Sequence, residues 1–346
     1  MAVMDGRSAD AIATAADALQ AGALVGFPTE TVYGLGADAG DDAAVARIFT
    51  AKGRPADHPL IVHVDDTAQG AQGVAVFAHQ VPAAAQALMQ TFWPGPLTLI
   101  LPRRAGVGRA AAGGQDSIGL RCPAHPVAQA LLHACRQRGV MGLAGPSANQ
   151  FGRVSPTTAA HVLAEFGPAL IVLDGGACAV GIESTIVDCT RGTPVLLRPG
   201  AISLAQLERA CGQRVHNAQE AQEGQPDAPA PRASGTLMAH YAPKAKLRLM
   251  VASALQTALD MLGNDVQASA QGPVIATYAR RELRSRSGGV LVQRMPDDAA
   301  STAQQLFAVL RAFDDRGVKL IWVETPPDDA AWDGVRDRLQ RAAAAS

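Results

Sequence analysis

The sequence predicts an α/β protein made of two domains, a larger N-terminal one and a smaller, Rossmann-like C-terminal one. Short apolar runs typical of buried strands alternate along the chain with amphipathic stretches typical of helices. The chain has 346 residues, which suits one large or two ordinary domains. Hydrophobic residues make up 48% of it and charged residues 18%, a composition that argues against global disorder.

The first domain is predicted to span residues 8–211. Helical spacing of apolar residues begins near Ile12, and an apolar run that stops at Pro28 indicates a buried strand. Asp41 or Asp42 is expected to cap the next helix. Further strands are expected at 97–101, 140–144, 170–173, 185–187 and 195–197. Further helices are expected at 126–138, after an N-cap at Ser155, and after a capping box of Ser203 with Gln206.

Composition changes after residue 211. Residues 212–236 are rich in Gln, Ala, Pro, Gly and Asp and show little periodicity, so 212–243 is predicted to be a linker or lid. Regular alternation returns in 244–346, the predicted second domain. Strands are expected there at 247–251, 274–278, 290–292 and 320–323, and helices at 252–262, 299–313 and 328–343. The sequence has no G-x-G-x-x-G, so dinucleotide binding is not supported.

Charge and cysteine usage restrict the classes of function. The formal net charge is −1, so any nucleic-acid contact would need a local basic patch. The five cysteines form no C-x-x-C pair, which argues against a structural zinc site. We see neither a signal-like N-terminus nor an apolar run long enough to span a bilayer, and we expect a cytoplasmic protein without a membrane partner.

Two short motifs in the first domain could carry chemistry. The stretch 28–36, P-T-E-T-V-Y-G-L-G, follows a buried strand directly, where ligands bind in open α/β sheets. It would equally suit a tight turn. The stretch Lys52-Gly53-Arg54-Pro55 places two cations where they could hold a polyphosphate, although a basic helix C-cap is the simpler explanation. His58 and His63 follow closely and flank an apolar run.

Other polar residues stand at the ends of predicted strands. Ser117 and Arg121 bracket one strand, and the arginine could bind a carboxylate or lie at the surface. The stretches 145–149, 155–157 and 181–185 offer small hydroxyl and amide groups, either as a nucleotide cradle or as ordinary turns. The sequence has no Walker A loop, H-E-x-x-H or G-x-S-x-G. ATP would therefore have to be held by dispersed side chains.

Together these stretches resemble the threonylcarbamoyl-AMP synthase family with its YrdC-like domain. The matching pieces are P-T-E-T-V-Y-G-L-G, A-K-G-R-P, P-L-I-V-H, W-P-G-P-L-T, G-L-R-C-P, P-S-A-N, S-P-T, E-S-T-I-V-D and L-R-P-G, which occur in this order between residues 28 and 200. The segment 234–243, S-G-T-L-M-A-H-Y-A-P, and the C-terminal unit resemble the long two-domain form of the family.

The resemblance implies a twisted mixed sheet with a concave site and a defined reaction. Threonine, bicarbonate and ATP would yield threonylcarbamoyl-AMP and pyrophosphate, and a tRNA threonylcarbamoyl transferase complex would use the adenylate to modify adenosine 37 of tRNA. Magnesium is expected with the phosphates, although no carboxylate cage is visible in the sequence. Weak RNA binding is a further expectation, because the family's concave face is sometimes linked to double-stranded RNA.

The resemblance also implies residue roles. Lys52 and Arg54 would be catalytic. Threonine would be bound by Thr31, His63, Arg121, Gly145 and Ser184. ATP would be bound by Lys52, Arg54, His58, Ser117, Ser147, Asn149, Ser155, Arg198 and Tyr241. His58 stands where the family usually has Asn, and its imidazole could still donate a hydrogen bond.

Two other functions are compatible with parts of the pattern. An RNA-binding module without catalysis would need a basic, aromatic-lined face, whereas aromatic residues make up only 4% of this chain. A carbamoyl transferase of hydrogenase maturation carries a similar domain, but that architecture also has zinc-finger cysteine pairs, which this sequence lacks.

Overall fold

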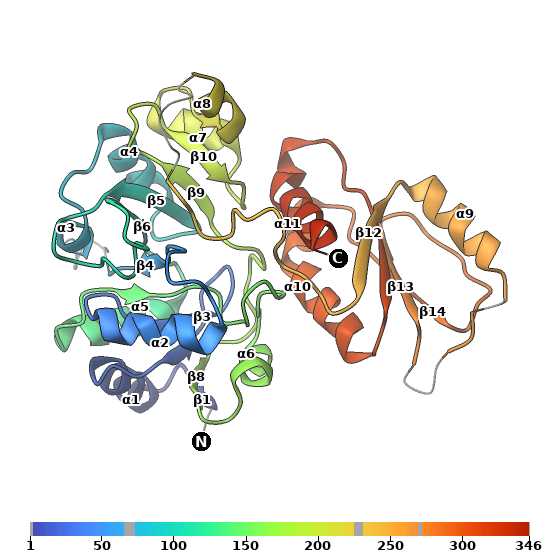
Figure 1. Cartoon of the computed structure of the whole chain (residues 1–346), viewed down its shortest axis with the longest axis horizontal. Coiled ribbons are helices and arrows are strands. Elements are labelled where there is room, and N and C mark those ends of the chain that lie inside the picture. The colour runs from blue at the N-terminus through green and yellow to red at the C-terminus, as the bar shows by residue number, and fades with distance from the viewer. Residues whose placement is uncertain (1–2, 66–72, 225–230, 265, 269–271, 346) are drawn as a thin grey trace. The chain divides into compact units, whose positions relative to one another are not determined.

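The computed structural model describes residues 3–65, 73–224, 231–264, 266–268 and 272–345, and these divide into two compact units. The first unit comprises residues 1–151 and 155–236, and the second comprises 152–154 and 237–346. Both are α/β, as the sequence predicts (Figure 1).

Among its described residues, the first unit forms one twisted mixed sheet in the order β1-β8-β2-β3-β7-β4-β6-β5-β9-β10-β11. Its strands are β1 (Val3–Asp5), β2 (Val25–Phe27), β3 (Gly34–Asp38), β4 (Ile61–His63), β5 (Leu97–Pro102), β6 (Ser117–Arg121), β7 (Leu143–Ala144), β8 (Ile171–Asp174), β9 (Thr185–Asp188), β10 (Val195–Arg198) and β11 (His216–Asn217). Its helices are α1 (Ala9–Gln20), α2 (Asp42–Lys52), α3 (Gly73–Phe77), α4 (Ala83–Phe92), α5 (Pro126–Gln137), α6 (Ala159–Phe166), α7 (Leu204–Cys211) and α8 (Ala218–Gly224).

Two hydrophobic cores lie on opposite faces of this sheet. One is packed beneath α1 and α5, and the other beneath α2, α4 and α7. Leu143 belongs to the first core and its neighbour Ala144 to the second, as the alternation of side chains along a strand requires. These cores cover both faces over much of the sheet, but where β4, β5 and β9 carry Ile61, Ile100 and Ile186 one face borders a pocket.

Local signals in the sequence explain where several helices begin. Asp41 caps α2 through a hydrogen bond from the backbone N–H of Ala43, and Ser203 and Gln206 form the predicted capping box of α7. The predicted N-cap at Ser155 is wrong. The helix α6 begins at Ala159 and is capped by Thr158.

The second unit is a smaller α/β domain with a four-stranded parallel sheet in the order β12-β15-β13-β14. Its strands are β12 (Lys246–Met250), β13 (Ile275–Ala279), β14 (Val290–Arg294) and β15 (Leu320–Glu324). Its helices are α9 (Ala252–Leu262), α10 (Ala299–Asp315) and α11 (Asp333–Ala344), with the 3-10 turn η1 (Ala330–Trp332). The parallel strands, with α9 connecting β12 to β13 and α10 connecting β14 to β15, confirm the Rossmann-like prediction.

Candidate active site

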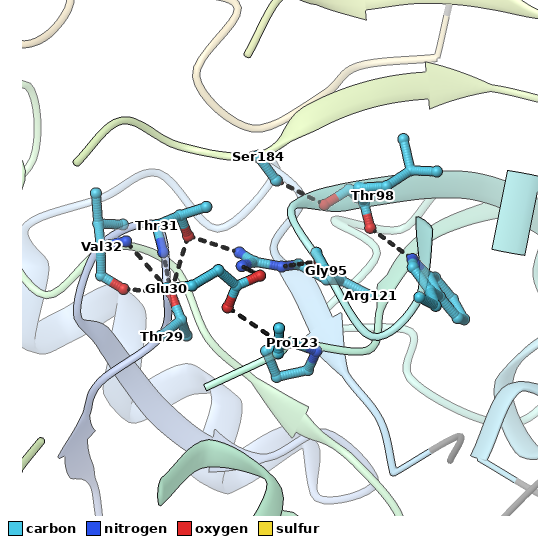
Figure 2. A network of polar contacts seen from close by, with 12 residues as sticks. Thr29, Glu30, Thr31, Val32, Gly95, Thr98, Arg121, Pro123 and Ser184 are labelled. Carbon is cyan, nitrogen blue, oxygen red and sulfur yellow. Dashed lines mark hydrogen bonds and ion pairs between the residues drawn. The ribbon is translucent and has the colours of Figure 1, made fainter. Parts of the chain in front are cut away.

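The ends of β4 and β6 place two predicted site residues side by side. His63 and Arg121 are direct partners in the parallel pairing of these strands. Arg121 also reaches the loop after β2, where its Nη1 donates to the hydroxyl of Thr31 at 2.8 Å (Figure 2). Thr29 accepts hydrogen bonds from the backbone N–H groups of Thr31 and Val32, and this local turn fixes the loop.

An acidic residue that the sequence analysis left without a role completes this group. Glu30 Oε1 lies 2.6 Å from Arg121 Nη2, and Glu30 Oε2 accepts a hydrogen bond from the backbone N–H of Ala124 at 3.1 Å. Arg121 Nε donates to the carbonyl of Gly95 at 3.2 Å. Both charged side chains are largely buried, so each needs the other's charge. Glu30 belongs to the P-T-E-T motif, but the arginine that pairs with it lies far away in the sequence, so the motif alone does not reveal the ion pair.

His63 is enclosed and uncharged. Burial, reinforced by the positive charge of Arg121, lowers the pKa of His63 from 6.5 to about 3. The ring meets Phe27 edge-on, with 5.5 Å between ring centroids. Gly145 allows this packing, because a Cβ there would lie 2.9 Å from His63 Nδ1 and 3.0 Å from the Phe27 ring. The predicted residues Thr31, His63, Arg121 and Gly145 are thus brought together.

Ser184, immediately before β9, bonds a residue of β5 and a cation at the end of β10. Its hydroxyl lies 2.7 Å from that of Thr98 and accepts from Arg198 Nη2 at 3.1 Å. Arg198 also donates to the carbonyl of Ser184 from Nε and Nη2, and to the carbonyl of Ser234 from Nη1 at 2.8 Å. Figure 2 shows Ser184 and Thr98 in one view with Arg121. The structure thus brings together Ser184 and Arg198, two of the predicted site residues.

Lys52 ends α2 and is buried beneath the loop that follows β7. Its Nζ donates to the carbonyls of Ser147, at 2.7 Å, and of Asn149. Burial, with a smaller contribution from the charge of Arg54, lowers the pKa of Lys52 from 10.5 to about 7, while the two carbonyl acceptors favour the charged form. In this arrangement Lys52 holds the P-S-A-N loop in place.

Arg54 lies beside the segment that carries Ser234. Its Nη2 donates to the carbonyl of Pro59 at 2.8 Å and reaches the hydroxyl of Ser234 at 3.5 Å. His58 contacts the ring of Phe151 edge-on, and burial lowers the pKa of its imidazole. Ser117 lines a pocket with an apolar floor that includes Ile61, Ile100 and Ile186.

Ser155 donates its hydroxyl hydrogen bond to the carboxylate of Glu183 rather than capping a helix. Both side chains are buried. Within the described ranges, no group of three or more His, Cys, Asp or Glu side chains could hold a metal ion.

Tyr241 belongs to the second unit. It is buried against Phe307, with ring centroids 5.5 Å apart, and the guanidinium of Arg338 lies 5.3 Å from its ring centroid. Its φ of 62° is the one positive value among non-glycine residues in the described part of the chain. This constrained backbone holds the H-Y-A-P segment in a fixed shape, and the predicted contact of Tyr241 with ATP stays a prediction.

The fold and the gathered residues define an α/β protein with a YrdC-like domain that carries a buried polar group around Arg121 and a cationic group around Arg198. Comparisons with known proteins agree. One family model, described as telomere recombination, matches residues 17–200, and another, described as the C-terminal domain of threonylcarbamoyl-AMP synthase, matches residues 202–344. The chain belongs to the threonylcarbamoyl-AMP synthase family in its two-domain form, which confirms the predicted resemblance.

Several relatives match along nearly their whole length. The threonylcarbamoyl-AMP synthase of Pyrococcus abyssi is 36% identical, with 96% of this chain and 93% of the relative covered. That of Bacillus subtilis is 37% identical, with 96% of this chain and 92% of the relative covered. The crystal structure of Pyrococcus abyssi Sua5 complexed with L-threonine superposes with a TM-score of 0.81 at 36% identity. The superposition covers 96% of this chain and 94% of that one.

Proposed function

We propose that this protein makes threonylcarbamoyl-AMP and pyrophosphate from L-threonine, bicarbonate and ATP, and so acts as a nucleotidyltransferase. The observation that carries this proposal is the gathering of two kinds of cation in one stretch of the sheet. Arg121, which suits a carboxylate, ends β6, and Arg198, which suits phosphates, ends β10 and bonds Ser184 just before β9; β6, β5, β9 and β10 are consecutive strands. Full-length relatives that bear the synthase name favour this function over an RNA-binding module or a hydrogenase-maturation transferase.

The proposed chemistry has two steps. The α-ammonium of threonine first loses a proton, and the neutral amine attacks the carbon of bicarbonate and expels water, which gives a carbamate. A carbamate oxygen then attacks the α-phosphorus of ATP while pyrophosphate leaves. Arg121 would hold the threonine carboxylate, and Arg54 and Arg198 would neutralise phosphate charge. These guanidinium groups are pre-oriented by backbone carbonyls, which reduces the cost of ordering them when the substrates bind.

The segment 231–236 lies where we expect the nucleotide, and we propose that it closes over bound ATP as part of the lid. Ala233 packs with Ile61, Ile100 and Ile186, and Ser234 contacts Arg54 and Arg198. Arg232 anchors the segment through Asp57, at 2.7 Å, and the carbonyl of Gly113. Arg232→Ala should speed the release of ATP in stopped-flow measurements, and an unchanged release rate would contradict the lid.

The proposal extends to a metal ion, a partner and a location. Magnesium would accompany the triphosphate, and a tRNA threonylcarbamoyl transferase complex would consume the adenylate. No helix among the described residues is long and apolar enough to cross a membrane. All five cysteines are free thiols, which suits the reducing cytoplasm that we propose as the location. Weak RNA binding stays a prediction.

The central test is pyrophosphate release with each substrate omitted in turn. We expect release only when threonine, bicarbonate and ATP are all present, and equal release without threonine would reject the synthase. Arg198→Gln should reduce turnover by on the order of 100-fold or more, because it removes a charge from the phosphate site. Arg104→Gln, at an exposed position of the same unit, serves as the matched control and should keep full activity.

A further inference from the structure

Three buried side-chain atoms near the end of β6 have hydrogen-bonding capacity that no other described residue uses. They are Glu30 Oε1, Arg121 Nη2 and His63 Nδ1. A buried polar atom without a hydrogen bond costs free energy, and native proteins keep few of them. Two of these atoms, Glu30 Oε1 and Arg121 Nη2, face each other in an ion pair, and all three keep hydrogen-bonding capacity that a ligand can use.

The geometry of the Glu30–Arg121 pair shows how this capacity arises. Oε1 and Nη2 are only 2.6 Å apart, yet no aligned hydrogen bond joins them, so the contact is an ion pair. The other atoms of both side chains are held firmly. Glu30 Oε2 accepts from Ala124, and Arg121 donates to Gly95 and Thr31. One acceptor and one donor are thus presented next to each other by fixed side chains.

The charges of this pair are complementary to those of an amino acid. A carboxylate only accepts hydrogen bonds and a guanidinium only donates them. A zwitterionic α-amino acid presents the reverse pair, an ammonium donor beside a carboxylate acceptor. His63 lies next to Arg121 on the neighbouring strand and offers a further neutral acceptor.

We propose that Glu30 binds the α-ammonium group of the amino-acid substrate while Arg121 binds its carboxylate. The inference rests on the proposed function and adds a recognition residue to it. The site then selects a zwitterion, because a ligand that lacks the amine leaves the Glu30 carboxylate without its partner. A role limited to holding Arg121 in place would instead affect every carboxylate ligand equally.

The two roles are separated by comparing L-threonine with 3-hydroxybutanoate, which is threonine without its α-amine. Calorimetric titration should show the wild-type protein binding threonine on the order of 10 to 100-fold more tightly. In Glu30→Gln this preference should fall to within about threefold. Glu282→Gln makes the same charge change at an exposed position of the second unit and should leave the preference intact.

The possible failures point to different conclusions. If the wild-type protein binds no threonine, the proposed function fails. If it binds threonine and Glu30→Gln keeps the full preference, the ammonium contact alone is wrong. Should Glu30→Gln not fold, the wild-type protein still decides the matter through threonine titrations at pH 7.5 in buffers of different ionisation enthalpy. An ammonium bound to Glu30 gives no net proton release, and release of one proton would overturn the inference.

Discussion

The neutral, enclosed ring of His63 predicts a specific sensitivity of the first unit to acid. Its pKa is lowered to about 3, whereas the unfolded chain has the ordinary value of 6.5. Between these two values the unfolded state binds more protons at this ring, so the free energy of unfolding falls as the pH is lowered below 6.5. Above 6.5 the ring makes no pH-dependent contribution.

The magnitude follows from the same two values. Each pH unit below 6.5 costs about 1.4 kcal/mol until the folded pKa is approached, so acidification to pH 5 should cost about 2 kcal/mol at this site. His63 is only 3% exposed, so solvent screens this cost very little.

The assay compares wild-type protein with His63→Gln by hydrogen exchange at pH 7, 6 and 5. Exchange within β4 reports on the first unit alone, which matters because a chain of two units need not unfold in one step. The variant, whatever its stability at pH 7, should lose about 2 kcal/mol less than wild type between pH 7 and pH 5. His79→Gln, at an exposed position, should follow wild type. Parallel losses in wild type and His63→Gln would refute the reasoning.

Three further predictions concern single contacts. Gly145→Ala pushes a methyl group against His63 and should weaken threonine binding by about 10-fold or more, with ATP binding retained, as measured by titration with each ligand. Lys52→Met leaves two buried carbonyls without their hydrogen-bond donor, so it should lower the stability of the first unit by about 1–3 kcal/mol and abolish turnover. Hydrogen exchange in the loop after β7 that is as slow as in the wild type would contradict this. Glu324→Gln removes the negative charge that pairs with Arg280 at 2.5 Å and should destabilise the second unit by about 2 kcal/mol. The loss should be seen in the fluorescence of the two tryptophans of that unit, while hydrogen exchange in the first unit stays unchanged.

Some elements could be predicted from neighbouring residues alone. The cap of α2 at Asp41 and the capping box of α7 are made by side chains that bond to backbone groups two or three positions away, so the sequence contains everything they need. Ser155 shows where such reasoning fails. It stands before Pro156 like an N-cap, but its hydroxyl bonds Glu183, and Thr158 takes the capping role.

The candidate site likewise contains residues whose role the sequence indicated and residues whose role it did not. The sequence indicated Arg121 as a carboxylate-binding group and Arg198 as a cation near phosphates. It gave Glu30 no role beyond a carboxylate in the P-T-E-T turn, because a glutamate in a turn carries no sign of its partner until the arginine at the end of β6 is brought beside it. Ser234 was likewise treated as linker, and only the folded chain places its carbonyl on Arg198.

By itself, the sequence determined the α/β class, the Rossmann-like second domain and the family resemblance, because periodicity, caps and short motifs are properties of adjacent residues. Tertiary structure decided which polar groups meet. The hydroxyl of Thr31 and the guanidinium of Arg121 are 90 positions apart in the chain, and their contact exists only because the sheet sets β2 and β6 in their places. The burial that makes the Glu30–Arg121 pair strong and His63 neutral is likewise a property of the whole fold, since desolvation depends on every element packed around a group.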